Sequence, residues 1–316
     1  MAKTLREYYG EALVRYGKEN EKIIVLDADV SGSTRSALFR DAFPDRHINV
    51  GIAEANMTGM AAGLASVGII PFVNTFAAFV TSCGLLAART FGSYSRLPIK
   101  LVGTYSGMSD AFDGPSHHAV DDIAIMRAQP NFEVIVPCDA TSTDWAVRHC
   151  IETEKPIYLR MSRDVFPNIY PEGEPFEIGK GKVVRDGKDV TVIACGLLVG
   201  HALTAADVLE QEGLSVRVVD MFSIKPIDSE LILKCAAETG AIVSAEEHSV
   251  IGGLCGAVSE VLIQSSCPVP LEFVGINDTH GECGPYKELQ AKYGFDANAV
   301  IEKIRRVLKK KEAFGK

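Results

Sequence analysis

Residues 49–65 read NVGIAEANMTGMAAGLA, an apolar run in which the one charged residue is Glu54. A strand-like segment ends just before Glu54 and helical spacing follows it, as in the repeating unit of an α/β protein. Ala55, Gly59 and Gly63 recur every four residues, which predicts a helix with one side almost free of side chains, where another helix could approach closely. Since ligand sites of open α/β sheets lie at the carboxyl ends of strands, we expect the Glu54 carboxylate to project from that edge. The alternative is that Glu54 only stabilises the first helical turn.

Strand-like runs alternate with helical patterns on both sides of this unit. In the first half of the chain the expected strands are 22–29, 47–54, 69–76, 99–106, 131–138 and 156–163. In the second half we expect strands at 189–196, 214–221, 241–248 and 269–276, with helices from about His201, near Asp228, after Gly253 and over 299–311. This alternation predicts an α/β fold of two domains, each a mainly parallel sheet flanked by helices.

The alternation stops in residues 167–181, PNIYPEGEPFEIGKG, where Pro, Gly and Glu dominate as they do in surface linkers. We therefore expect a first domain over residues 1–170, a linker over 171–185 and a second domain over 186–316. A chain of 316 residues, 47% of them hydrophobic, is long enough to bury a core in each domain.

Composition excludes several classes of protein. The formal net charge of -9 lacks the basic footprint that binding to a phosphate backbone requires, so we expect no nucleic-acid partner. Residues 1–17 are charged and helical in pattern, without the apolar core of an export signal. The eight cysteines form no Cys-x-x-Cys pair, which argues against a zinc ribbon and a redox dithiol. Reduced thiols in a cytoplasmic protein fit these features.

Residues 55–88 contain no charged side chain, and a run of this length raises the question of a membrane span. Pro71, Asn74 and several glycines divide the run into a helix, a short strand and another helix, each too short or too interrupted to cross a bilayer. We therefore expect no membrane segment. So apolar a stretch should lie in the centre of a domain or at an interface between subunits.

Five blocks in the first half of the chain carry a resemblance to a known family. They are 43–68, 71–80 (PFVNTFAAFV), 110–122 (DAFDGPSHHAVDD), 136–140 (VPCDA) and 159–163 (LRMSR). In order and spacing they resemble the pyrimidine-binding domain of transketolase, and the later half, from IGKG (178–181) through AEEHSVIGG (245–253), resembles its C-terminal domain. The resemblance covers nearly the whole chain. It extends more loosely to deoxyxylulose-phosphate synthase and to the beta subunits of 2-oxo-acid dehydrogenases.

The resemblance implies that Glu54 hydrogen-bonds a ring nitrogen in the aminopyrimidine of thiamin diphosphate. The thiazolium carbon of this cofactor is a weak acid, and the cofactor's own imino group takes the proton only in a tautomer that a carboxylate can stabilise. By the same resemblance Phe76 and Phe79 form an aromatic wall against the aminopyrimidine, with core packing as the alternative. Where the family has a tyrosine in this wall, the chain has Ser82.

The segment DGPSHH combines a turn with an acid and two imidazoles, a loop composition suited to polar ligands. The resemblance implies that Asp113 and His117 contact the hydroxyls and carbonyl of a sugar substrate, with His117 assisting proton transfer. The alternative is a surface turn with incidental histidines. The resemblance implies no role for His118.

Sugar phosphates require a cationic clamp, and arginine can hold a phosphate through two parallel hydrogen bonds. Arg6, Ser33 and Arg163 correspond to the positions at which transketolases place phosphate ligands. Taken singly, each would be interpreted as a solvated surface residue. The histidine that completes this clamp in the family corresponds to Tyr105, a neutral donor.

Transketolases bind the cofactor diphosphate through a metal held by a Gly-Asp-Gly motif with a downstream Asn, and the sequence contains no Gly-Asp-Gly. The resemblance therefore implies a separate N-terminal subunit that supplies the diphosphate site and a divalent metal such as Mg²⁺. The cofactor would be shared between the two chains, in an assembly with two copies of each. Phosphorylated sugars are the implied substrates.

The function that this resemblance implies is that of the C-terminal half of a split transketolase, which moves a two-carbon ketol unit from a ketose phosphate to an aldose phosphate. A deoxyxylulose-phosphate synthase would have an arginine in the loop before its DG-x-x-H segment, where this chain reads TYSGMSDAF (104–112). A 2-oxo-acid dehydrogenase beta subunit would dock onto a lipoyl-bearing core. A non-catalytic scaffold of the same fold would bind no cofactor. These three alternatives stay open on the sequence.

Overall fold

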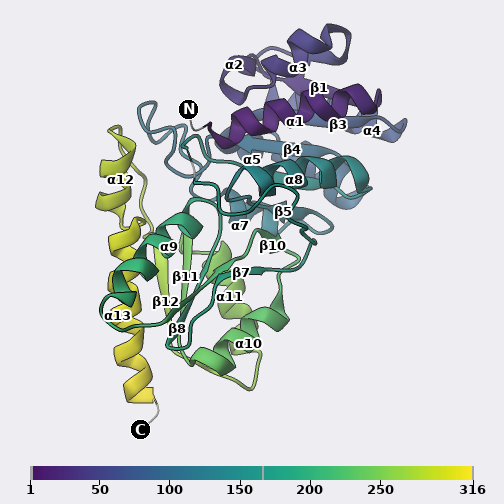
Figure 1. Cartoon of the computed structure of the whole chain (residues 1–316). Coiled ribbons are helices and arrows are strands. Elements are labelled where there is room, and N and C mark those ends of the chain that lie inside the picture. Colours follow the sequence, from purple (N-terminus) through teal and green to yellow (C-terminus); the bar gives the residue numbers. More distant parts are fainter. Residues whose placement is uncertain (1–2, 166, 315–316) are drawn as a thin grey trace.

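The computed structural model describes residues 3–165 and 167–314, which form two α/β domains (Figure 1). A seven-stranded sheet lies in the first domain and a five-stranded sheet in the second. Both sheets are mainly parallel and carry helices on their faces, so the predicted fold class is confirmed.

The first sheet has the order β10-β5-β6-β4-β3-β1-β2. Its strands are β1 Ile23–Asp27, β2 His47–Asn49, β3 Ile70–Phe76, β4 Lys100–Thr104, β5 Glu133–Ile135, β6 Ile157–Arg160 and β10 Ser223–Lys225. The first six fall within the six predicted runs and are parallel to their neighbours. The seventh, β10, comes from the second half of the chain and pairs antiparallel with β5, which the sequence did not predict.

Local sequence accounts for the helices of the first domain. They are α1 Leu5–Glu19, α2 Ser31–Thr34, α3 Ala37–Ala42, α4 Glu54–Ser66, α5 Ala77–Ser82, α6 Leu85–Ala87, a π-helical turn Ala88–Tyr94, α7 Asp122–Arg127 and α8 Ala140–Glu152, with a 3₁₀ turn at Pro44–Arg46. A capping box formed by Thr4 and Glu7 begins α1, and another formed by Asp139 and Ser142 begins α8. Each box satisfies backbone N–H groups that the helix leaves unpaired.

The charge-free run 55–88 folds into α4, β3 and the short helices that follow, as predicted. No helix in the described ranges 3–165 and 167–314 is long and apolar enough to cross a bilayer. Gly59 and Gly63 lie on one side of α4, and no described atom outside the helix lies within 4 Å of the position that a Cβ would occupy on either glycine. That side of α4 is therefore open in the single chain.

The second sheet has the order β12-β11-β8-β9-β7. Its strands are β7 Lys182–Arg185, β8 Val190–Ala194, β9 Val216–Asp220, β11 Ile242–Ser249 and β12 Leu271–Ile276. Its helices are α9 Leu197–Glu210, α10 Ser229–Thr239, α11 Leu254–Ile263, α12 Tyr286–Tyr293 and α13 Ala297–Phe314. Two expectations need correction. The predicted linker over 171–185 ends in β7, which pairs antiparallel with β9, and α9 begins at Leu197, before His201.

The carboxyl ends of β8, β9 and β11 are covered by the first domain. The Cys138 thiol donates to the Asp220 carboxylate at 3.1 Å, and the Arg160 guanidinium donates to the Glu247 carbonyl oxygen at 2.8 Å. In an open α/β sheet this edge is where ligands bind. Here it is filled by protein, so a ligand site is to be sought on the first domain.

Candidate active site

The candidate residues gather where the strands of the first sheet end. The connection after β1 leads to one side of the sheet and the connection after β3 leads to the other, so these two adjacent strands flank a topological switch point. Ser33 follows β1, Phe76 ends β3 and Tyr105 follows β4. Carboxyl ends of strands at a switch point are the usual ligand site of open sheets.

An aromatic wall stands at the end of β3. The rings of Phe76 and Phe79 are stacked with centroids 5.7 Å apart, and the Tyr105 ring lies 4.4 Å from Phe76. His117 approaches Phe79 edge-on at 5.0 Å. Ser82 is exposed and its hydroxyl donates to a carbonyl oxygen of its own helix, so it adds no ring surface. The wall is therefore made of phenylalanine, with tyrosine and histidine beside it.

Glu54 begins α4, as predicted, and its side chain is only 8% exposed. Across the described residues no hydrogen bond or ion pair reaches its carboxylate, so no contact joins Glu54 to the other candidates. Its carboxylate oxygens are not among the buried atoms that lack a partner, so they are open to solvent and to a ligand. Glu54 is thus suited to accept a proton or hydrogen bond from a ligand.

A cationic cluster lies beside the wall. Two guanidinium groups lie close to the Tyr105 ring, with Arg6 at 4.8 Å and Arg163 at 5.0 Å from its centroid. A bridge between Thr4 and Val165 holds the start of α1 against the chain that follows β6. This bridge is what places Arg6 and Arg163 near each other although 157 positions separate them in sequence.

Arg6 is the buried member of this cluster. Its Nη1 donates to the Ser33 carbonyl oxygen at 2.7 Å and to the Tyr105 hydroxyl, while its buried Nε has no partner among the described residues. Burial lowers the pKa of Arg6, opposed by Tyr105 and reinforced by Arg35 and Arg163. Crowded cations that lack a full set of partners form a site for an anion.

The loop after β4 carries the predicted sugar ligands. Asp113 is exposed and His117 is half-buried; His117 borders the aromatic wall, and both residues neighbour Asp110. Asp110, in the same loop, is fully buried and pairs with Arg163 at 3.3 Å. Burial and the neighbouring Asp113 raise the pKa of Asp110 to about 6, against the lowering effect of Arg163 and His117.

Sequence reasoning missed two residues that the fold adds to this group, Asp110 and Arg35. Arg35 lies 3.6 Å from the Glu7 carboxylate and beside Arg6. Its position two residues after Ser33 was a signal, as was the spacing of Asp110 three residues before Asp113. Neither signal shows that the side chains meet.

The loop after β4 rests on Glu247 from the second domain. The Met108 backbone N–H donates to the Glu247 carboxylate at 3.0 Å, and the Tyr286 hydroxyl donates to the same oxygen. Gly107 has a φ of +62°, and a Cβ there would lie 2.2 Å from the Glu247 side chain. Only glycine permits this close approach without strain. Glu247 is therefore a direct support of the loop that carries Tyr105 and Asp110.

This support should make stability depend on pH. Burial raises the pKa of Glu247 to about 7 from an ordinary 4.5, despite the lowering effects of Arg160 and the two hydrogen bonds. The folded chain therefore holds this proton more tightly than the unfolded chain. The resulting stability is complete below about pH 4.5 and is lost as the pH rises to about 7.

We expect Glu247→Gln to remove a stability difference on the order of 2–3 kcal/mol between pH 5 and pH 8. Urea unfolding at both pH values measures it. The exposed Glu302 offers a matched control, since Glu302→Gln changes charge equally without touching the loop. An unchanged pH dependence in Glu247→Gln would show that Glu247 is not the group responsible.

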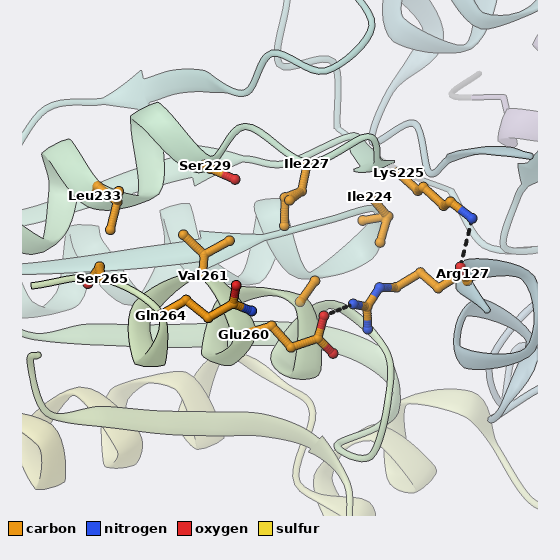
Figure 2. A pocket seen from close by; sticks show the side chains of 11 residues that line it. Arg127, Ile224, Lys225, Ile227, Ser229, Leu233, Glu260, Val261, Gln264 and Ser265 are labelled. Atoms are coloured by element: carbon orange, nitrogen blue, oxygen red, sulfur yellow. Dashed lines mark hydrogen bonds and ion pairs between the residues drawn. The ribbon is translucent and has the colours of Figure 1, made fainter. Parts of the chain in front are cut away.

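A separate cavity of about 500 Å³ lies away from these residues, between the second domain and α7 (Figure 2). Figure 2 shows Arg127 at one end, paired with Glu260 at 2.5 Å, and the Lys225 amine donating to the Arg127 carbonyl oxygen at 2.8 Å. Ile227 and Leu233 form part of its apolar wall. None of the predicted site residues lines it. Among the described residues, no group of three or more His, Cys, Asp or Glu side chains could hold a metal ion.

Comparison with known proteins places this geometry in a family. Residues 1–168 match the family description "Transketolase, pyrimidine binding domain", and residues 179–300 match "Transketolase, C-terminal domain". The chain belongs to the transketolase family. The resemblance inferred from the sequence blocks is thereby confirmed.

Individual members of the transketolase family are similar over their full length. A putative transketolase C-terminal section of Methanocaldococcus jannaschii is 44% identical, covering 98% of this chain and 97% of the relative. A 6-deoxy-6-sulfo-D-fructose transketolase subunit of Clostridium sp. is 37% identical, covering 97% and 95%. A solved structure described as a split gene transketolase, inactive beta4 tetramer, is 46% identical with a TM-score of 0.89, covering 98% and 99%.

Proposed function

We propose that this chain is the C-terminal subunit of a thiamin-diphosphate-dependent transketolase divided between two polypeptides. It would transfer a two-carbon ketol unit from a ketose phosphate to an aldose phosphate, and only together with a separate N-terminal subunit. The observation that carries this proposal is the continuous group formed by the aromatic wall, the loop after β4 and the arginine cluster. These three parts offer a surface for a flat ring, polar groups for a sugar and cations for a phosphate.

The residues present fit the aminopyrimidine half of thiamin diphosphate. Phe76 and Phe79 offer stacked rings for a flat heteroaromatic group, and Glu54 offers a carboxylate without a described protein partner. When bound, the cofactor would supply the carbanion chemistry that transfers the ketol unit. Glu54 would hold the proton at the ring nitrogen, and His117 would give or take a proton at the sugar.

The partner would bear the Gly-Asp-Gly motif, the diphosphate site and a divalent metal such as Mg²⁺. Several large apolar side chains are exposed in the single chain, and a partner subunit would cover them. Ile52 is 83% exposed, Leu86 77% and Tyr94 85%. The open side of α4 at Gly59 and Gly63 offers close approach to a further helix. We propose a cytoplasmic heterotetramer with two copies of each subunit.

Reconstitution tests the proposal. The chain is mixed with a polypeptide of the family that contains Gly-Asp-Gly and a downstream Asn, together with thiamin diphosphate and Mg²⁺. Ketol transfer from xylulose 5-phosphate should require both chains. Binding of thiamin diphosphate by calorimetry provides a readout independent of turnover. A mixture that assembles but binds no cofactor would refute every thiamin-dependent function, and would favour a scaffold.

Arg163 provides a specific prediction for the phosphate end. Arg163→Leu should raise the KM for a ketose phosphate by about 10- to 100-fold, the value of a charge-assisted hydrogen bond, with a smaller effect on kcat. A neutral ketose donor should be little affected. Arg148→Leu is the matched control, because Arg148 is exposed on α8 and pairs only with Glu152 among the described residues. Equal effects on neutral and phosphorylated donors would contradict the assignment.

A further inference from the structure

Nearby carboxylates neutralise part of the positive charge of the cationic cluster. Three guanidinium groups gather there, those of Arg6, Arg35 and Arg163. Arg35 lies 3.6 Å from the Glu7 carboxylate, and Arg163 lies 3.3 Å from the Asp110 carboxylate. Three cations and two carboxylates leave one positive charge in excess.

The two carboxylates differ in their surroundings. Glu7 belongs to the capping box of α1, so the fold of the helix accounts for its position. Asp110 caps no helix, and the described ion pair of its carboxylate is the one with Arg163. It is fully buried, and its Oδ2 has no hydrogen-bond partner within the described part of the chain. Leaving a carboxylate oxygen buried and unpaired costs stability, which calls for a functional explanation.

Asp110 also lies between the two parts of the substrate site. On one side its Oδ1 pairs with Arg163, at the phosphate end. On the other side it neighbours Asp113 and His117, the predicted sugar ligands. The His118 ring lies beside the same loop, and neither of its nitrogens has a hydrogen-bond partner among the described residues. Within the described part of the chain, these four residues are charged or titratable neighbours of Asp110.

We propose that Asp110 is a specificity-determining residue, whose carboxylate offsets the charge of Arg163 and so reduces the preference of the site for donors with a doubly charged terminal group over singly charged ones. This inference rests on the proposed function, because it concerns the same substrate site. A terminal anion approaching Arg163 competes with Asp110 for the guanidinium N–H groups. A second negative charge on the anion is attracted more strongly to the guanidinium groups, but it is also repelled more strongly by Asp110, so Asp110 offsets part of that gain.

The test compares three ketose donors in the reconstituted complex. One is neutral, one carries a terminal phosphate and one carries a terminal sulfonate, which has a single charge at every pH used. Turnover of the neutral donor requires the proposed function but does not require binding of a terminal anion. If the neutral donor reacts, Asp110→Asn should lower the KM for the phosphate donor about fivefold at pH 7.5, the value of a partly exposed ion pair. The KM for the sulfonate donor should fall less, and kcat should change little.

The pH dependence gives a second measurement that needs no stable variant. The sulfonate keeps its charge, so a change in its KM reports on the protein. In the wild-type complex this KM should rise as the pH increases from about 5 to 7.5, because Asp110 loses its proton with a pKa of about 6. Asp110→Asn should flatten the profile, whereas a slope that stays the same in both proteins would show that Asp110 is not the group responsible.

Asp164→Asn is the matched control. Asp164 adjoins Arg163 in sequence, but its carboxylate accepts from the Val165 backbone N–H instead. This variant should leave the KM for all three donors unchanged. The proposal is overturned if Asp110→Asn raises the KM for the phosphate donor or leaves it unchanged, or if Asp164→Asn has the same effect. Asp110→Ser serves as a second variant if Asp110→Asn fails to fold.

Discussion

Glu54→Ala is expected to lower the ketol-transfer rate of the reconstituted complex by about 10²- to 10⁴-fold, the usual contribution of a positioned proton-transfer group. Glu54 is 8% exposed as a residue, and its carboxylate has no partner in the described chain, so the cofactor ring is its expected partner. Glu54→Gln should be impaired too, because an amide cannot hold the proton. The loss should appear in kcat rather than in assembly with the partner.

A second readout separates catalysis from structure at Glu54. The rate at which bound thiamin diphosphate exchanges the proton of its thiazolium carbon should fall with turnover. If Glu54 only stabilises the first turn of α4, both rates stay normal and the chain loses about 0.3–1 kcal/mol of stability. Glu230→Gln is the matched control, since Glu230 occupies the first turn of α10 and is exposed. A fully active Glu54→Ala complex would refute the assignment of Glu54.

Arg160→Met is expected to destabilise the chain by about 3–5 kcal/mol, because it leaves the Asp122 carboxylate buried without its charge partner. Asp122 is fully buried and accepts from Arg160 Nε at 2.7 Å and from the Tyr158 hydroxyl at 2.6 Å. Burial would raise the pKa of Asp122, but the charge and hydrogen bond of Arg160 hold it below its ordinary value. Arg160 also donates to the Glu247 carbonyl oxygen, so the variant should loosen the contact between domains.

Urea unfolding of a double-mutant cycle tests this prediction. Asp122→Leu combined with Arg160→Met removes both charges, and it should recover a large part of the loss. Arg148→Met controls for the removal of an exposed arginine and should change stability by less than about 0.5 kcal/mol. A loss below about 1 kcal/mol for Arg160→Met would mean that water or another cation reaches Asp122.

The loop after β4 shows which parts of the site could be predicted from the sequence. The composition of DGPSHH indicated polar ligands, and the resemblance pointed to Asp113 and His117. Their roles stay predictions, but the structure puts His117 beside the wall and both residues beside Asp110, the partner of Arg163. Asp110 was not predicted, because its importance arises from burial and from contact with Arg163, fifty-three positions away.

The sequence singled out Tyr105, but it could not predict which side chains Tyr105 contacts. The sequence identified it as a neutral replacement for a histidine. The fold packs its ring against Phe76 and brings it close to the guanidinium groups of both Arg6 and Arg163. These contacts depend on separate segments of the chain meeting at one edge of the sheet.

The sequence by itself determined the alternation of strands and helices, the helix that begins at Glu54 and the membership of a family, because these follow from local periodicity and short ordered blocks. Only the tertiary structure decided that β10 completes the first sheet, that Glu247 supports the loop after β4, and that Asp110 neutralises part of the arginine cluster. Those contacts join residues far apart in the chain. Their energies depend on burial, which exists only after the two domains have packed together.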